Sequence, residues 1–96
     1  MMILKRDNTK VGFNPQKIIS AIEKAFIEVD GKIYEHDTAQ DIALEIGKKI
    51  ASNKNEVFSV EQIQNWVEEY LMRSERPDVA RAYIRYRYKK EVARSY

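Results

Sequence analysis

A chain of 96 residues is long enough for one domain with a modest hydrophobic core, and it leaves no room for a separate substrate domain. With 44% hydrophobic and 33% charged residues it is expected to fold, and a net charge of +2 does not by itself indicate a nucleic-acid partner. The absence of cysteine excludes disulfides, thiolate metal sites and a cysteine nucleophile, and it fits the cytoplasm, where we expect the protein.

The N-terminal residues predict a β-hairpin. Residues 3–6 are short and strand-like, and residues 10–13 would form the returning strand. Asp7, Asn8 and Thr9 between them are typical of a turn, because Asn tolerates the left-handed backbone of a tight hairpin. Two strands this short are not stable alone in water, so we expect them to lie against the rest of the fold.

An amphipathic helix is predicted over residues 15–30. Asn14 suits the N-cap, Pro15 suits the first helical position, and Gly31 suits the C-cap. Apolar residues recur between these ends at helical spacing: Ile18, Ile22, Ala25, Phe26 and Val29. This stripe is expected to face the core.

Three more helices follow. Asp37 or Thr38 is expected to cap the second helix, which ends near residues 52–55. Ser59 and Gln62 form a capping box at the start of the third, which residues 74–77 interrupt. The connections are short, so the sequence predicts a mainly α (α+β) fold with an N-terminal hairpin and a small bundle of four helices.

The fourth helix begins at Pro77 or Asp78, and nothing in the sequence stops it before Tyr96. A helix that runs uncapped to the last residue indicates that the natural chain continues. We therefore expect residues 1–96 to be one domain at the N-terminus of a larger protein.

Three cations near the N-terminus are candidates for anion binding: Lys5, Arg6 and Lys17. Lys17 is the third residue of the first predicted helix, where unpaired backbone N–H groups and the helix dipole already favour an anion. The cap is the uncharged Asn14, so no carboxylate there repels a phosphate. The alternative is that these three side chains are ordinary solvated charges.

The last helix carries a second basic feature. Arg81, Arg85 and Lys89 recur every four residues, and Tyr83, Tyr86 and Lys90 lie on a neighbouring face. Tyrosine beside a cation suits a stacked base or a bound phosphate, in a nucleotide or in a nucleic acid. The alternative is a half-buried helix whose tyrosines pack and whose cations are solvated.

Nothing in the sequence predicts a catalytic centre. The acidic residues are scattered, and no Ser-His-Asp set can be recognised. The three glycines are too sparse for a phosphate-binding glycine loop, and the single histidine, His36, has no companions that would complete a metal site. We therefore expect a domain without enzymatic activity.

Three segments together resemble the ATP-cone family. Residues 5–18 carry KRDN, VGF and KI, residues 60–72 carry VEQIQNWVE and LM, and residues 79–87 carry VARAYIRYR. Each segment alone is a weak signal, but their order and spacing cover residues 2–90 and are specific in combination. The form of the last segment is most similar to the N-terminal cone of anaerobic, class III ribonucleoside-triphosphate reductases.

The resemblance implies a lid of short strands over a four-helix bundle, with ATP or dATP bound between them and Mg²⁺ accompanying the phosphates. The nucleotide would switch an attached reductase on or off. The implied phosphate contacts are Lys5, Arg6 and Lys17; the implied base contacts are Ile3, Asn14 and Ile18; Lys89 and Tyr86 would complete the pocket from the last helix.

Two positions depart from the family pattern. Asn8 stands where glycine is usual, and Val11 stands where some cones carry an acidic residue. The second departure leaves the preference between ATP and dATP open.

The expected partners are an adenine nucleotide, a catalytic reductase domain and a reductase oligomer. No membrane partner is expected, because the apolar runs are too short to span a bilayer. Three alternatives remain: the cone of a nucleotide-sensing transcriptional repressor, a helical module that binds nucleic acid through Arg81, Arg85 and Lys89, and an interaction module without a small ligand. The repressor family carries a cysteine zinc ribbon before its cone, whereas this chain has no cysteine.

Overall fold

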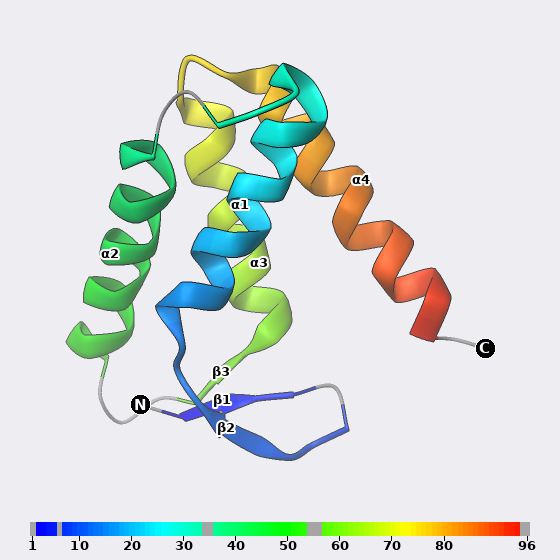
Figure 1. Ribbon diagram of the computed structural model, residues 1–96. Helices are drawn as coiled ribbons and strands as arrows, with labels where there is room; N and C mark the ends of the chain where they lie inside the picture. The colour runs from blue at the N-terminus through cyan, green and yellow to red at the C-terminus, as the bar shows by residue number, and fades with distance from the viewer. Residues whose placement is uncertain (1, 6, 34–35, 54–56, 95–96) are drawn as a thin grey trace.

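The computed structural model describes residues 2–5, 7–33, 36–53 and 57–94, with side chains up to residue 90. Its elements in chain order are β1 (Met2–Leu4), β2 (Lys10–Gly12), α1 (Pro15–Asp30), α2 (Asp37–Ser52), β3 (Phe58–Ser59), α3 (Val60–Arg73) and α4 (Pro77–Arg94). The small sheet lies at one end of the helices, with α1 and α3 between α2 and α4 (Figure 1). The predicted arrangement of an N-terminal hairpin and four helices is confirmed.

The sheet has three strands in the order β2-β1-β3. β1 pairs antiparallel with β2, with Ile3 opposite Val11, and parallel with β3, with Ile3 opposite Phe58. Ile3 and Phe58 are both buried in the core. The strand β3 was not predicted, because two residues are too few to show an alternating pattern, yet it is what joins the hairpin to the start of α3.

The hairpin strands are shorter than predicted, because the turn begins earlier. The N–H of Lys5 donates to the carbonyl of Thr9 at 2.8 Å, and the N–H of Asn8 donates to the carbonyl of Lys5 at 3.0 Å. Asn8 has a φ of 68°, in the left-handed region where glycine is usual and Asn is tolerated. The turn therefore forms without the glycine of the family pattern.

Two of the three predicted N-caps are confirmed. The Asn14 side chain accepts from the N–H of Gln16 at 3.0 Å. Ser59 and Gln62 make both hydrogen bonds of the capping box. The expected cap of α2 by Asp37 or Thr38 is wrong: the helix begins at Asp37, whose carboxylate lies in the first turn, where the helix dipole favours it.

The core lies where α1 packs against α2 and α4, and where α3 closes against α4. Its largest fully buried side chains are Phe26, Ile22, Ile46, Leu71, Val67 and Val79. Among the α4 side chains described, up to residue 90, those in this core belong to the first two turns: Val79, Ala80, Ala82 and Tyr83. Residues 85–90 are polar or charged and none of them is buried, which leaves them available to line a site.

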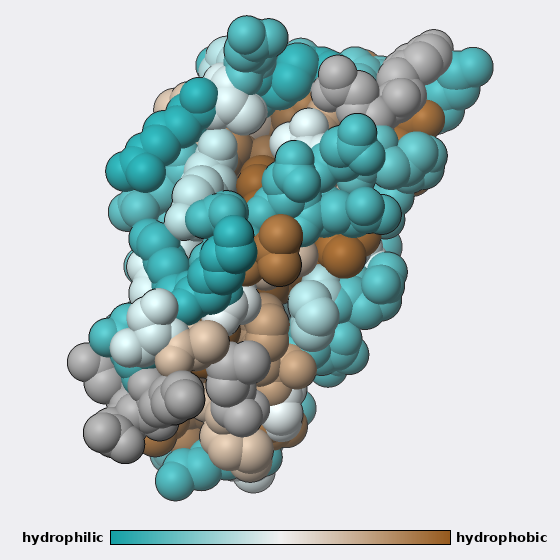
Figure 2. Space-filling model, turned by 90° about the vertical axis from the view of Figure 1, so that its left-hand side faces the viewer, coloured by the Kyte–Doolittle hydropathy of each residue, from teal (hydrophilic) through white to brown (hydrophobic). Residues whose placement is uncertain are grey.

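Charged and polar side chains cover most of the face formed by α2, with apolar side chains showing between them (Figure 2). Within the part of the chain described here, no helix has both the length and the apolar character needed to cross a bilayer.

Arg76 links the end of α1 to the start of α4, at the end of the bundle away from the sheet. Its guanidinium donates two hydrogen bonds to Asp30, at 2.7 and 3.0 Å, and two to Asp78, both at 3.1 Å. It also lies 5.6 Å from the centre of the Phe26 ring. The hydrogen bond from Arg76 is the main cause that lowers the pKa of Asp78. This network fixes the end of α1 against the start of α4, away from the sheet.

Candidate nucleotide-binding site

A cavity of about 740 Å³ opens between the sheet and the helices α1, α3 and α4. This volume falls within the roughly 300–1,000 Å³ typical of ligand pockets. Its lining comes from the hairpin (Ile3, Lys5, Asp7, Val11, Gly12), from Phe13 and Asn14, from α1 (Gln16, Lys17, Ile18, Ser20, Ala21, Lys24), from α3 (Val60, Ile63, Gln64, Val67) and from α4 (Tyr83, Tyr86, Arg87, Lys90).

The cavity has an apolar floor and a cationic surround. Buried side chains such as Ile3, Ile18 and Val67 form the floor. Among the described lining residues, five are cationic (Lys5, Lys17, Lys24, Arg87 and Lys90) and one, Asp7, is acidic. Cations therefore outnumber carboxylates in the described lining, whereas the whole chain carries a net charge of only +2. An apolar floor with several cations suits a ligand that joins a flat ring to an anionic group.

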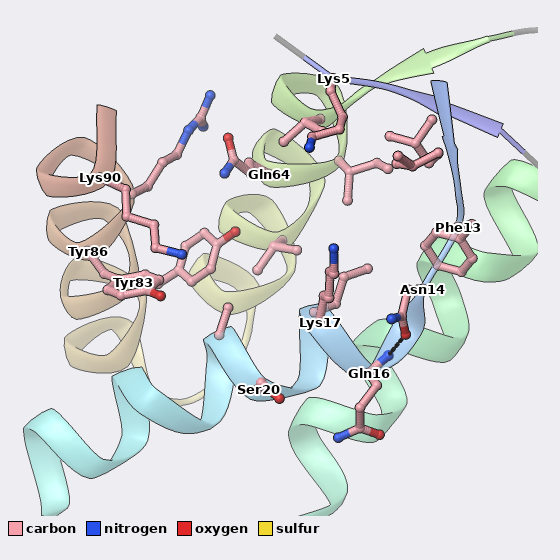
Figure 3. A pocket seen from close by; sticks show the side chains of 18 of the residues that line it. Lys5, Phe13, Asn14, Gln16, Lys17, Ser20, Gln64, Tyr83, Tyr86 and Lys90 are labelled. Atoms are coloured by element: carbon pink, nitrogen blue, oxygen red, sulfur yellow. Dashed lines mark hydrogen bonds between the residues drawn. The ribbon is translucent and has the colours of Figure 1, made fainter. Parts of the chain in front are cut away.

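The start of α1 supplies the first cationic group. Lys17 is the third residue of the helix, and the first turn contains no acidic side chain. Its charge therefore adds to the positive end of the helix dipole and is not neutralised within that turn. Lys17 points up into the cavity and Lys5 points toward it from the strand side (Figure 3). Two elements thus present cations to the same space.

The α4 side supplies a second cationic group around Tyr86. The Lys24 ammonium donates to the Tyr86 hydroxyl at 3.4 Å and lies 5.5 Å from the ring centre. The Lys90 ammonium lies 5.2 Å from the same ring centre. Hydrogen bonding to Lys90, with a smaller contribution from Lys24, lowers the pKa of the Tyr86 hydroxyl, whereas burial raises that of Tyr83. The two ammonium groups thus converge on Tyr86. Tyr86 and Lys90 lie on the wall of the cavity opposite Asn14 (Figure 3).

Asp7 stands at the edge of the cavity in a fixed orientation. Its carboxylate accepts from the Thr9 hydroxyl at 2.6 Å and from the Thr9 N–H at 3.1 Å. The hydrogen bond from the Thr9 hydroxyl is the main cause that lowers the pKa of Asp7. This carboxylate therefore stays ionised at neutral pH.

The sequence matches the family model of the ATP cone domain over residues 1–92. The chain belongs to the ATP-cone family. It is 38% identical over 94 residues to the anaerobic ribonucleoside-triphosphate reductase of Haemophilus influenzae. The matched region covers 96% of the chain and 13% of that protein. It is 39% identical over 98 residues to the vitamin B12-dependent ribonucleoside-diphosphate reductase of Thermoplasma acidophilum, covering 96% of the chain and 12% of that protein.

A third relative is the ribonucleoside-diphosphate reductase subunit alpha of Chlamydia pneumoniae, 35% identical over 99 residues, with 97% of the chain and 10% of that protein covered. The cone thus spans only about a tenth of the length of the relatives it matches. As an ATP cone it is a nucleotide-binding regulatory module of the ribonucleotide reductase type, and it is not itself the catalytic part.

Six of the eight site residues predicted from the sequence line the cavity of the cone: Ile3, Lys5, Asn14, Lys17, Ile18 and Tyr86. Arg6 lies outside the described residues. Lys89 is exposed and does not line the cavity, whereas Lys90 does. Lys90 follows Tyr86 by four residues and Tyr83 by seven, so it lies on the face of α4 that carries both lining tyrosines, whereas Lys89 follows Tyr83 by six residues and is turned away from that face.

Sequence reasoning missed several lining residues of the cone. Lys24 follows Lys17 by seven residues, so both lie on one face of α1, and this spacing was a usable signal. Gln64 and Arg87 gave no such signal, because only the packing of α3 against α4 brings them to the cavity.

The predicted basic stripe of α4 is separate from this cavity. Arg81, Arg85 and Lys89 are exposed and do not line it. Arg85 instead pairs with Glu28 of α1 at 3.3 Å. The cone therefore has two distinct basic features, one enclosed with aromatic and apolar neighbours and one on the open surface.

Proposed function

We propose that the cone binds ATP or dATP in the cavity between the hairpin and the bundle, and thereby regulates an attached ribonucleotide reductase. The observation that carries this proposal is the meeting of five cationic side chains from the hairpin, α1 and α4 around one apolar floor. Phosphates are recognised by such cations and by helix N-termini, and an adenine ring suits the apolar part.

In this proposal Lys5, Arg6 and Lys17 hold the phosphates, with Lys24 and Lys90 as further cations. The base lies against Ile3, Asn14 and Ile18. The support is that these side chains, Arg6 apart, share one cavity with Tyr86. Lys89 is not included, because its exposed position on α4 is outside the lining.

Mg²⁺ would accompany the phosphates. This ion is usually held by phosphate oxygens, waters and one or two carboxylates rather than by an all-protein cage. Asp7 fits that role, since it is ionised, oriented by Thr9 and placed at the edge of the cavity. The ion would neutralise part of the phosphate charge there.

Regulation would follow from differential binding. A nucleotide shifts a reductase between two assemblies only by the difference in its affinity for them. The parent protein we propose is an anaerobic ribonucleoside-triphosphate reductase, supported by the resemblance to the Haemophilus influenzae enzyme of that name. The catalytic domain and the reductase oligomer would be the partners that respond.

A melting scan of this chain tests the proposed ligand. Nucleotide at about 100 times its dissociation constant stabilises the folded state by about 2.7 kcal/mol. Since about 1 kcal/mol moves the melting temperature of a domain this small by roughly 4–8 °C, we expect an increase of roughly 10–20 °C with ATP or dATP. CTP and UTP at equal concentration should give a much smaller shift. No increase with either adenine nucleotide at millimolar concentration would exclude the proposal.

A further inference from the structure

Arg87 lies between the cavity and the outer surface of the bundle. It lines the cavity from α4, and its side chain is only 11% exposed. One of its terminal nitrogens donates to Glu68 at 2.8 Å and to Asn65 at 2.7 Å, both on α3. Arg87 thus borders the cavity while its guanidinium is hydrogen-bonded to residues of a neighbouring helix.

The two residues bonded to Arg87 lie on a surface separate from the cavity. Asn65 and Glu68 line a shallow groove between α3 and α4, together with Glu69, Met72, Arg73 and Ile84. The groove opens to solvent and shares no residue with the lining of the cavity. The side chain of Arg87 therefore bonds to groove residues and also borders the cavity.

We propose that Arg87 couples the two surfaces, because phosphate in the cavity and the carboxylate of Glu68 compete for its guanidinium. This inference rests on the proposed function, since it requires an anionic ligand in the cavity. Guanidinium binds phosphate in a bidentate manner, so a triphosphate is a strong competitor for a bond to one carboxylate oxygen.

The competition changes the outer surface. Glu68 is paired with Arg87, and its side chain is 24% exposed. When phosphate draws the guanidinium into the cavity, Glu68 loses that partner, and the groove presents two carboxylates, those of Glu68 and Glu69, beside Arg73. Ligand binding is thereby converted into a change of charge on a surface that the ligand does not touch.

Thermodynamic linkage makes this competition reciprocal. If phosphate binding weakens the pair between Arg87 and Glu68, then weakening that pair must strengthen phosphate binding. Glu68→Gln is therefore expected to tighten ATP binding about 3- to 10-fold, because the neutral amide holds the guanidinium less strongly than a carboxylate does. The matched control is Glu69→Gln, which removes the same charge from the next residue in the same groove. It should change the affinity by less than about twofold, since only a screened long-range effect remains.

Calorimetric titration of the full chain with ATP, and then with adenosine, measures both variants against the wild type. Adenosine has no phosphate, so its affinity should be equal in all three proteins. A second readout needs no substitution: ATP should shift the carboxylate carbon resonance of Glu68 more than that of Glu69.

Suppose that the wild type binds ATP, but Glu68→Gln tightens the binding no more than Glu69→Gln does. That result would overturn the coupling and leave the proposed function standing. The same gain with adenosine as with ATP would also overturn it. A wild type that binds no ATP would overturn both.

Discussion

Lys17→Ala is expected to weaken ATP binding by about 10- to 150-fold, because a hydrogen bond to a charged group contributes roughly 1.5–3 kcal/mol and about 1.4 kcal/mol corresponds to a factor of ten. Lys17 stands in the first turn of α1, after the uncharged cap Asn14, and points into the cavity toward Lys5 (Figure 3). In the proposed complex its charge and the helix dipole would act on the same phosphate.

The substitution should not harm the fold. A cation in the first turn opposes the helix dipole, so its removal should leave the melting temperature of the unliganded chain unchanged or slightly higher. Arg85→Ala is the control, because Arg85 is exposed, pairs with Glu28 and does not line the cavity. Calorimetry should show a large loss for Lys17→Ala and a small one for Arg85→Ala. A larger loss of affinity for Arg85→Ala than for Lys17→Ala would indicate that the ligand binds on the outer face of α4, and would favour a nucleic-acid partner.

Leu71→Ala is expected to destabilise the domain by about 2–5 kcal/mol, because it removes buried methyl groups and leaves a cavity. Leu71 has no exposed surface and is among the largest fully buried side chains. At roughly 4–8 °C for each kcal/mol, the melting temperature should fall by about ten degrees or more. This is a large share of the roughly 5–15 kcal/mol that stabilises a typical domain.

Met72→Ala provides the comparison on the adjacent residue of α3. Met72 is 53% exposed, so its truncation should change the stability by no more than about 0.5 kcal/mol. Chemical denaturation of the two variants measures both effects. Equal losses would show that α3 does not face the core in the way described here.

Local signals in the sequence were sufficient to predict most of the fold. The caps at Asn14 and Ser59 and the C-cap at Gly31 depend on residues within one turn of the helix end, and all three are confirmed. The strand β3 and the cap of α2 were not predicted correctly. Pairing of β3 with β1 joins residues more than fifty positions apart, and no local pattern specifies it.

The candidate site was predictable where one element supplies the chemistry, as at the start of α1. Residues from α4 were harder, because their role depends on which face of a weakly amphipathic helix meets the cavity. Lys89 and Lys90 are adjacent and chemically identical but lie on different faces, and the packing of α4 against α1 decides that the face of Lys90 meets the cavity. Arg87 needed the contact of α3 with α4 as well.

The central claim is that an adenine nucleotide occupies the cavity between the hairpin and the bundle, and an NMR titration of the ¹⁵N-labelled chain with ATP tests it most directly. We predict that the largest amide shifts occur in the turn around Lys5, at the N-cap Asn14, at Lys17 of α1, and near Gln64 and Tyr86. The outer face of α2 should change little, because none of its residues lines the cavity. Shifts centred on the exposed stripe of α4, or no shifts at millimolar ATP, would contradict the account.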